Sequence, residues 1–330
     1  MSGRVDVLIV ALPTTAGWRG AVPALARAVE AAGASVAVAA AAPAREVRTF
    51  PLTDLVQARA ARTAAQAGVA AHAPRAVIYA SSTAALLGPR AGAIWFDSPA
   101  AENRPGRHGV WQRPLERRRM ARAPLLLPMS AGGLAALDGR RDRLPAPAVV
   151  LPVPVEPSAP AAAPPPDRDV AALAYAADAR KKGLDRILAA WARARRPGET
   201  LLVAGQPAGP LGDGAEGTGL LAPDDYRALL RRARAFVAAP RHEDYGIAQL
   251  EALADGCRLV SAPASGPYPA LALARALDPR LVSDDLAGAI RAALDAPPGD
   301  YAERAAALLA PYRRAAFDAT VREQVLPALL

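Results

Sequence analysis

The sequence predicts an α/β protein with two domains, each built on a parallel sheet that is covered by helices on both faces. The chain has 330 residues, which favours about two domains of roughly 100–200 residues each. In both halves, apolar runs of strand length alternate with helical patterns, as parallel strands and their crossovers require. A proline-rich stretch, residues 154–168, interrupts this alternation near the middle.

The first half contains unbroken apolar runs, which are typical of parallel strands buried on both faces. The strands are expected at residues 5–12, 35–43, 75–82, 91–96, 124–130 and 147–155. The helices that separate them are expected at residues 21–33, 55–71 and 113–123. Residues 13–20, between the first strand and the first helix, are expected to form a loop.

The second half restarts the alternation. Its strands are expected at residues 170–177, 200–205, 219–223, 233–240, 258–264 and 279–284. Its helices are expected at residues 183–194, 224–235, 246–256 and 284–295, and a final helical stretch at 301–330. The second of these helices begins with aspartates, which suit an N-cap.

The pattern divides the chain into an N-terminal domain, a linker, a C-terminal domain and a last helix. The ranges are 1–153, 154–168, 169–310 and 311–330, and the last helix is expected to pack back on the N-terminal domain. Prolines favour extended chain and remove backbone donors, which is why 154–168 is interpreted as a linker. Two parallel sheets joined in this way predict a cleft that their strands face with their carboxyl ends.

Composition excludes several classes of protein. Apolar residues make up 52% and aromatic residues only 5%, so cores of Ala, Val and Leu are expected. The single cysteine, Cys257, excludes an internal disulfide framework and a cysteine-rich zinc site, and is expected to be a buried thiol. No apolar run reaches about 18 residues, and the first strand begins without a signal-peptide pattern, so a cytoplasmic location is expected.

The formal net charge of +9 leaves two interpretations of the densest basic cluster. The cluster lies in the expected helix 113–123 and consists of Arg113, Arg117, Arg118, Arg119 and Arg122. It is either a solvated helix face or a peripheral contact with anionic lipid or with an acceptor. A basic stripe with interleaved aromatics is missing, so nucleic-acid binding is not expected.

The most informative stretch is FVAAPRHEDYGIAQLEALADGCRLV. A strand ends at Pro240, a polar turn follows, and Gly246 lets the backbone enter a helix tightly. Free N–H groups at a helix start favour an anion such as a diphosphate. Glu243 lies in the turn, and Glu251 borders the apolar stripe of the helix, where a carboxylate needs hydrogen-bond donors such as sugar hydroxyls.

This stretch resembles the family 4 retaining glycosyltransferases of the GT-B fold, which have two Rossmann-like domains. Their signature is two glutamates with seven residues between them, here Glu243 and Glu251, with an aromatic-Gly pair in that interval and a Gly stop, here Gly256, after it. The resemblance implies that Glu243 holds hydroxyls of the donor sugar and Glu251 holds the ribose or the sugar. The amides of Tyr245, Gly246 and Ile247 are then expected near the diphosphate. An ordinary amphipathic helix with surface glutamates is the alternative.

A second match lies upstream, in ALAYAADARKKGLDRIL. Lys182 and the glycine after it occupy the Lys-Gly position that binds the diphosphate in the family. The family's arginine would fall near Ala177 and is missing, and Arg180 or Lys181 is the expected substitute. In the strand TLLVAG, Gly205 matches the glycine that ends the corresponding family strand near the donor.

The N-terminal half matches the family by pattern. Gly17 resembles a glycine of the loop that approaches the phosphates, as does Gly20, and Arg19 is placed to meet an anion. Phe96-Asp97 stands where many relatives carry a catalytic-region histidine, and Asp97 is a candidate for a polar role there. His108, and His242 beside the first glutamate, are candidate acceptor residues.

The resemblance implies transfer of a hexose from a nucleotide sugar, such as a UDP- or GDP-sugar, to an unknown acceptor with retention of configuration. A polysaccharide or a lipid-linked glycan is the acceptor class considered. No metal is expected, because the cationic side chains and helix amides suit the diphosphate and no Asp-x-Asp pair ends a strand. A catalytically impaired relative or scaffold that binds a nucleotide sugar is the alternative. A dehydrogenase is not expected, because AGWRGA replaces G-x-G-x-x-G after the first strand.

Overall fold

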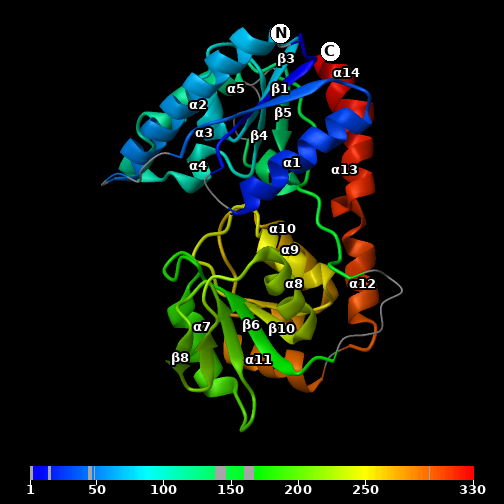
Figure 1. Ribbon diagram of the computed structural model, residues 1–330. Coiled ribbons are helices and arrows are strands. Elements are labelled where there is room, and N and C mark those ends of the chain that lie inside the picture. The colour runs from blue at the N-terminus through cyan, green and yellow to red at the C-terminus, as the bar shows by residue number, and fades with distance from the viewer. Residues whose placement is uncertain are drawn as a thin grey trace. The chain divides into compact units, whose positions relative to one another are not determined.

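The computed structural model describes residues 3–13, 16–43, 47, 49–137, 146–159, 167–296 and 298–330. The chain divides into two compact units (Figure 1). Unit 1 comprises Met1–Pro154 and Tyr312–Leu330, and unit 2 comprises Val155–Pro311. Part of the proline-rich stretch, residues 160–166, lies outside the described residues.

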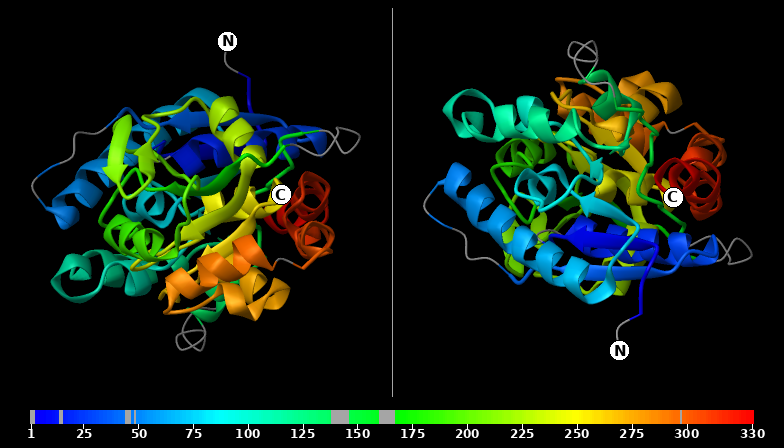
Figure 2. Two further views of the ribbon diagram at one scale, coloured as in Figure 1. Left: turned by 90° about the horizontal axis from the view of Figure 1, so that it is seen from below. Right: turned by 90° about the horizontal axis from the view of Figure 1, so that it is seen from above.

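Unit 1 contains a five-stranded parallel sheet in the order β2-β1-β3-β4-β5. The strands are β1 (Val7–Ala11), β2 (Val36–Ala40), β3 (Ala76–Ala80), β4 (Ala93–Phe96) and β5 (Leu126–Pro128). Its helical segments are α1 (Ala16–Ala31), α2 (Phe50–His72), α3 (Ser82–Leu86), α4 (Ala100–Asn103), η1 (Gly106–Gly109), α5 (Gln112–Met120), α6 (Ala131–Ala135), α13 (Arg314–Thr320), η5 (Val321–Val325) and α14 (Leu326–Leu329). Figure 2 shows them from two sides: α2 lies along β1 and β2, and α1 lies beside α13 and η5.

The end of the chain completes the core of unit 1. Phe317 on α13 is buried, and its ring centroid lies 6.1 Å from that of Trp95 on β4. Trp18 on α1 packs edge-on against the same indole at 5.4 Å. The Trp95 Nε1 donates a hydrogen bond of 2.9 Å to the Leu151 carbonyl, so the buried indole is also satisfied as a donor.

Unit 2 contains a six-stranded sheet in the order β11-β10-β6-β7-β9-β8, in which β8 pairs antiparallel with β9 and the other neighbours are parallel. The strands are β6 (Val170–Tyr175), β7 (Leu201–Ala204), β8 (Gly209–Gly212), β9 (Ala215–Gly217), β10 (Ala233–Ala238) and β11 (Arg258–Ser261). The helices are α7 (Leu184–Ala194), α8 (Pro223–Arg232), α9 (Ile247–Ala254), α10 (Pro269–Leu277), η3 (Pro279–Leu281), α11 (Leu286–Asp295), α12 (Tyr301–Leu308) and, at the boundary between units, η4 (Ala310–Tyr312).

Three expected strands are wrong. Residues 147–155 contain three prolines, which cannot donate to a ladder, and form only one isolated bridge, from Ala148 to Leu126. Residues 219–223 are not a strand, and the edge of the sheet is the hairpin of β8 and β9 instead. Residues 279–284 form η3 and one bridge, from Val282 to Ser261.

Helices α1 and α2 both begin five residues earlier than expected, α2 at Phe50 instead of residue 55, and the expected cap of α8 is also wrong. Helix α1 begins at Ala16, so its first turns take up most of the expected loop 13–20. Helix α8 begins at Pro223, after Ala222 as N-cap, and no aspartate caps it. Proline suits the first position of a helix because its missing N–H has no intrahelical partner there in any case. The expected final helix, 301–330, is a series of shorter helical segments.

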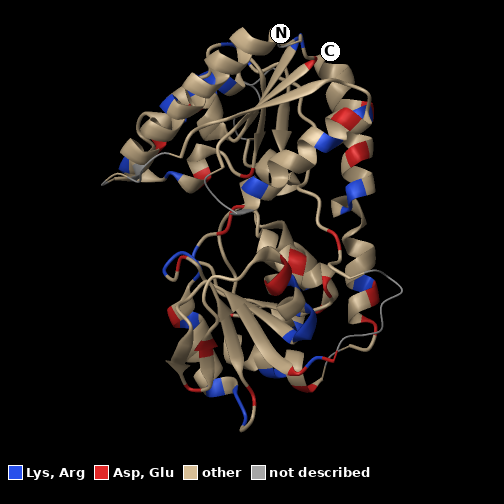
Figure 3. Ribbon diagram, viewed as in Figure 1, with Lys and Arg blue, Asp and Glu red and all other residues tan. Residues whose placement is uncertain are grey.

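Charged residues lie mainly on helices and loops, and the strands of both sheets are largely free of them (Figure 3). This distribution follows from parallel strands that are buried on both faces. Among the described residues, no helix is both long and apolar enough to span a membrane.

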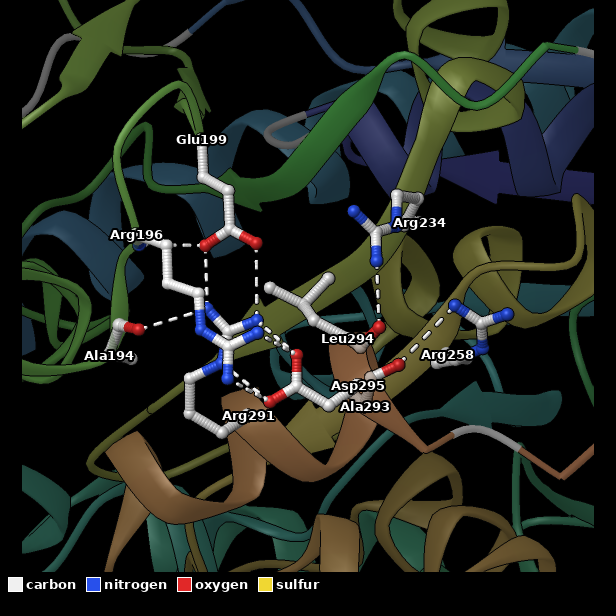
Figure 4. Close-up of polar contacts among 9 residues, drawn as sticks. All are labelled: Ala194, Arg196, Glu199, Arg234, Arg258, Arg291, Ala293, Leu294 and Asp295. Carbon is white, nitrogen blue, oxygen red and sulfur yellow. Dashed lines mark hydrogen bonds and ion pairs between the residues drawn. The ribbon is translucent and has the colours of Figure 1, made fainter.

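At the amino ends of β10 and β11, arginines hold the end of α11 (Figure 4). Arg234 donates to the Leu294 carbonyl at 2.7 Å and Arg258 to the Ala293 carbonyl at 3.3 Å. The last carbonyls of a helix have no intrahelical donor, and cations there also suit the helix dipole. These contacts attach α11 to the sheet at the edge opposite the carboxyl ends of the strands.

Candidate functional site

Two loops of unit 2 lie side by side because the strands that precede them are neighbours. Strand β6 leads through residues 176–183 into α7, and β10 leads through residues 239–246 into α9. β6 and β10 pair in parallel, so both loops leave the same edge of the sheet. A hydrogen bond of 3.2 Å from the Arg241 amide to the Lys181 carbonyl joins them.

Glycines at the two helix starts make this arrangement possible. Gly183 precedes α7 with φ +66°, and a Cβ there would collide with the Ala239 carbonyl of the other loop. Gly246 precedes α9 with φ +83°, and a Cβ there would lie 2.7 Å from the ring of Tyr268. Other residues rarely adopt this conformation. Neither helix has a side-chain cap, so the N–H groups of both starts suit an anion.

A buried ion pair links the two loops. The Lys182 Nζ donates a hydrogen bond of 2.6 Å to the Glu243 Oε2, and Glu243 is only 5% exposed. The Gln249 amide also reaches this oxygen, at 3.4 Å. A buried carboxylate needs such partners. The pair therefore holds a lysine and a glutamate, 61 residues apart in sequence, in contact at the sheet edge.

A second polar chain lies next to the first. His242 Nε2 lies 3.1 Å from Asp244 Oδ1, and His242 Nδ1 lies 2.9 Å from Ser265 Oγ. Lys181 Nζ pairs with the other oxygen of Asp244 at 3.5 Å. The hydrogen bond to the Asp244 carboxylate raises the pKa of His242, against the opposing effect of burial. Asp244 thus contacts a lysine of one loop and a histidine of the other, and the pKa of that histidine is raised.

The second glutamate of the motif lies on α9 and pairs with α8. Burial raises the pKa of Glu251, and the nearby Arg227 guanidinium opposes that shift. Arg227 Nη1 lies 3.4 Å from Glu251 Oε1, and its Nε donates a hydrogen bond of 2.7 Å to Asp255 Oδ2. Glu251 is therefore partly buried and ion-paired.

A small pocket lies at the carboxyl ends of β6 and β10. It is lined by Tyr175, Lys182, Phe236, Ala238, Ala239, Pro240, Ala248 and Gln249. The pocket therefore has one charged group, one amide and an apolar floor from β10.

The remaining donor-binding candidates lie around these loops. Arg180 is exposed, and its side chain has no hydrogen-bond partner in the part of the chain that the structure describes. Tyr245 is buried and Ile247 half-buried at the start of α9. Gly205 follows β7 with φ +86°, and a Cβ there would lie 2.9 Å from the backbone of Ala177. Gly205 therefore lets the strand end pass close to the 176–183 loop.

The candidates of unit 1 do not form a comparable cluster. Asp97 follows β4, is half-buried and accepts a hydrogen bond of 2.8 Å from the Ser98 amide. His108 is exposed in η1, and Arg19 is exposed on α1. Gly17 lies in the first turn of α1 without a positive φ, so its expected place in a loop was wrong and its conformational freedom is unused.

Sequence reasoning missed the partners of both glutamates. Gln249 contacts Glu243, and Arg227 with Asp255 surrounds Glu251. Of these three partners, only Gln249 could have been noticed in the sequence, as a polar residue between the apolar positions of its helix. Lysine usage is another missed signal: Lys181 and Lys182 are the two lysines of a sequence with 40 basic residues.

No metal centre is evident within the described residues. They contain no group of three or more His, Cys, Asp or Glu side chains placed to hold a metal ion.

Comparisons with known proteins match part of the chain to a family. The family model described as glycosyl transferases group 1 matches residues 169–296, which include both glutamates and Lys182. A search of the curated proteins gives no match.

Solved structures of similar fold cover nearly the whole chain. Sucrose-phosphate synthase from Thermosynechococcus elongatus is 18% identical with a TM-score of 0.65, covering 96% of each chain. WaaG, a glycosyltransferase involved in lipopolysaccharide biosynthesis, is 15% identical with a TM-score of 0.70, covering 98% of this chain and 99% of that one. Anabaena Alr3699/HepE, solved with UDP and glucose, is 14% identical with a TM-score of 0.69 and the same coverage. The chain has the GT-B fold of glycosyltransferases, and residues 169–296 carry the pattern of the group 1 glycosyltransferases.

Proposed function

We propose that the protein transfers a sugar from a nucleotide-sugar donor to an acceptor, and that the two loops before α7 and α9 bind the donor. The buried contact between Lys182 and Glu243, at two uncapped helix starts, is the observation that carries this proposal. In this contact, a lysine ammonium that can bind phosphate lies within hydrogen-bond distance of a carboxylate that can accept hydrogen bonds from sugar hydroxyls. The HepE structure, with UDP and glucose bound, belongs to a protein of the same fold.

The departing nucleoside diphosphate carries the charge that the site must stabilise. Lys182 supplies a positive charge, and the first N–H groups of α7 and α9 supply oriented dipoles. Arg180, exposed and without a side-chain partner among the described residues, takes the place of the missing family arginine. Charge stabilisation by groups that are already in place is often the largest contribution to catalysis.

The two glutamates have different proposed roles. Glu243 accepts hydroxyls of the donor sugar and orients the anomeric carbon, while Glu251 accepts those of the ribose. Both carboxylates are ion-paired and partly withdrawn from water, so their orientation is set before the donor binds. We propose a hexose as the sugar and retention at the anomeric carbon, as in the family 4 enzymes that the motif resembles.

The acceptor is proposed to be a polysaccharide or lipid-linked glycan, with Arg19, His108 and His242 as its candidate contacts and Asp97 as a candidate catalytic group. On α5, Arg119 donates to the Leu86 carbonyl and Arg113 to the Gly106 carbonyl. Three other arginines of this region are exposed and are proposed to meet an anionic lipid surface or acceptor: Arg117, Arg118 and Arg122.

A nucleotide-sugar-binding protein without turnover is the second candidate. Two observations favour it: the family arginine near Ala177 is missing, and Phe96-Asp97 replaces the histidine of many relatives. Binding of a nucleotide sugar without transfer or hydrolysis would support this candidate over the enzyme.

Nucleotide binding can be tested by thermal shift, first with UDP, GDP and ADP and then with the corresponding nucleotide sugars. A ligand that binds only the native state raises the melting temperature by mass action. We expect one base to stabilise the protein, and Lys182→Met to lose that shift and to lower turnover by about 100-fold or more. Arg193→Met, an exposed arginine of α7 paired with Asp285, is the matched control and keeps the shift.

The two lysines allow a direct check of the same site. An amine-selective reagent can modify only Lys181, Lys182 and the amino terminus of this sequence. We expect the stabilising nucleotide to protect Lys182 from modification, as peptide mass spectrometry would measure. Equal modification with and without the nucleotide, together with wild-type turnover in Lys182→Met and Glu243→Ala, would refute the proposed site.

A further inference from the structure

A second charged cluster of unit 2 lies on α8 and α9, apart from the contact between Lys182 and Glu243. Arg227 of α8 lies between two carboxylates, those of Glu251 on α9 and of Asp255, the C-cap residue of α9. The Asp255 side chain is 1% exposed and that of Arg227 is 17% exposed. The two carboxylates are four residues apart on one helix, where like charges repel. Arg227 therefore neutralises a repulsion as well as filling the space between them.

The guanidinium of Arg227 has one further acceptor, and Asp255 is itself held by another residue. Its Nη2 donates a hydrogen bond of 2.6 Å to the Glu156 carbonyl, in the segment that follows the boundary with unit 1. Asp255 in turn accepts hydrogen bonds from Ser158, at 2.7 Å from the amide and 2.9 Å from the hydroxyl. Two chain segments, residues 156–158 and 251–255, thus fix the position of one planar, always charged group.

The contact with Glu251 differs from the others. At 3.4 Å it is the longest that Arg227 makes with a carboxylate, and it involves only Oε1. The side chain of Glu251 is 26% exposed, and within the described residues its Oε2 accepts no hydrogen bond. One oxygen is therefore held by Arg227, and the other is left for a hydroxyl donor.

We propose that Arg227 is a positioning residue of the donor site, clamped by Asp255 and Glu156 so that it holds Glu251 ready to accept hydroxyls of the donor's nucleoside. The proposal rests on the proposed function, because Glu251 has its role only if a nucleotide binds. It assigns the missing partner of the second glutamate to a residue 24 positions upstream, outside the motif.

A purely structural role is the competing explanation, since breaking a buried ion pair also destabilises a fold. The two roles differ in how they depend on Glu251. If Arg227 acts through Glu251, its removal has no further effect on nucleotide binding once Glu251 has been neutralised. If Arg227 only supports the fold, its effect is the same in both backgrounds.

The test is a double-mutant cycle on the full chain with Arg227→Met, Glu251→Gln and the double variant. The probe is whichever of UDP, GDP and ADP stabilises the wild type, and calorimetry measures its Kd. We expect each single variant to bind about tenfold more weakly, and the double variant to bind like Glu251→Gln alone. Arg232→Met, on the same helix and in an exposed pair with Asp169, is the matched control and should bind like the wild type.

The pH dependence of nucleotide affinity is a readout that a structural role would not move. The groups that act on the Glu251 carboxylate are Arg227 and Asp255, and Tyr226 lies within its field. Removing the arginine takes away the effect that opposes burial, so the pKa of Glu251 rises further. The acid loss of affinity should therefore begin at a higher pH in Arg227→Met than in the wild type.

The outcomes separate this proposal from the proposed function. If no nucleoside diphosphate binds the wild type, both are overturned. If the wild type binds but Arg227→Met binds equally well, or if the two losses multiply to about a hundredfold, only the role of Arg227 is overturned. Where Arg227→Met fails to fold, Asp255→Asn releases the clamp while keeping the arginine, and the same cycle against Glu251→Gln decides.

Discussion

At the scale of single residues, the proposed donor site depends on side chains whose size and shape matter at their positions. Arginine outnumbers lysine throughout the sequence, yet both lysines stand at the start of α7. The compact ammonium of Lys182 reaches the buried Glu243 carboxylate at 2.6 Å, where a planar guanidinium needs more room. Gly183, the next residue, is required for a different reason, because the backbone of the neighbouring loop occupies the space of a Cβ.

Two glycine variants test this reason at the residue scale. Gly183→Ala should lower the free energy of unfolding by about 2 kcal/mol or more, because it places a Cβ in a left-handed conformation and against the Ala239 carbonyl. Gly20→Ala, in an exposed position of α1 where a Cβ meets nothing within 4 Å, should raise it by about 0.5 kcal/mol. Urea unfolding measures both, and equal effects of the two would contradict the argument.

At the scale of elements, α11 is held by charged contacts at the edge of the sheet opposite the loops that precede α7 and α9 (Figure 4). Arg291 of this helix forms hydrogen bonds with both oxygens of Glu199 at 2.6 and 3.1 Å, and pairs with Asp295 at 2.8 Å. These hydrogen bonds hold the pKa of Glu199 and of Asp295 below their ordinary values. One arginine therefore joins α11 to the residue that leads into β7.

The sign of these shifts predicts how stability depends on pH. A carboxyl whose pKa is lower in the folded state contributes stability above its unfolded pKa, here about 4.5 for Glu199 and 3.8 for Asp295. That contribution is lost as the pH falls through the lowered folded values. Arg291→Met should therefore be less stable than the wild type at pH 7, and the gap should narrow below about pH 4.

Urea unfolding between pH 7 and pH 3 measures this gap. Arg232→Met, which removes an exposed pair with Asp169, is the control and should change stability little at neutral pH, as exposed pairs usually do. A gap for Arg291→Met that stays constant across this range would show that the pairing with the two carboxylates is not its source.

At the scale of the whole molecule, the chain crosses between its two units twice. Unit 1 takes its last helices from the end of the sequence, and Phe317 enters its core beside Trp95. Unit 2 is one continuous segment with its own core, in which Phe236 and Trp191 are buried. Each unit can therefore lose stability by itself.

Phe317→Ala tests this division. A buried phenylalanine replaced by alanine costs about 3–5 kcal/mol, and here the loss should fall on unit 1. Hydrogen exchange followed by mass spectrometry should speed up in β3 and β4 and stay unchanged in β6 and β10. Phe236→Ala is the matched control with the opposite pattern, and faster exchange in both units for either variant would contradict separate cores.

Most elements of the fold could be predicted because their signals are local. Strands β1, β3, β6 and β10 are apolar runs of strand length. Gly183 and Gly246 mark the starts of α7 and α9, and Gly256 follows the end of α9. Predictions failed where a pattern was ambiguous over short range. The prolines near residue 150 leave a single bridge where a strand was expected. The helical position of Gly17 was missed because nothing in the neighbouring sequence distinguishes a loop from a first helical turn.

The sequence by itself determined the α/β class, the motif with Glu243 and Glu251, and the candidate lysine, because each depends on residues close together in the chain. Only the tertiary structure decided which groups meet: Lys182 with Glu243, Arg227 with Glu251 and Phe317 with Trp95. Those contacts depend on the order of strands in a sheet and on the return of the chain end. Neither can be predicted from local sequence patterns, because spacing along the chain does not specify which distant segments become neighbours.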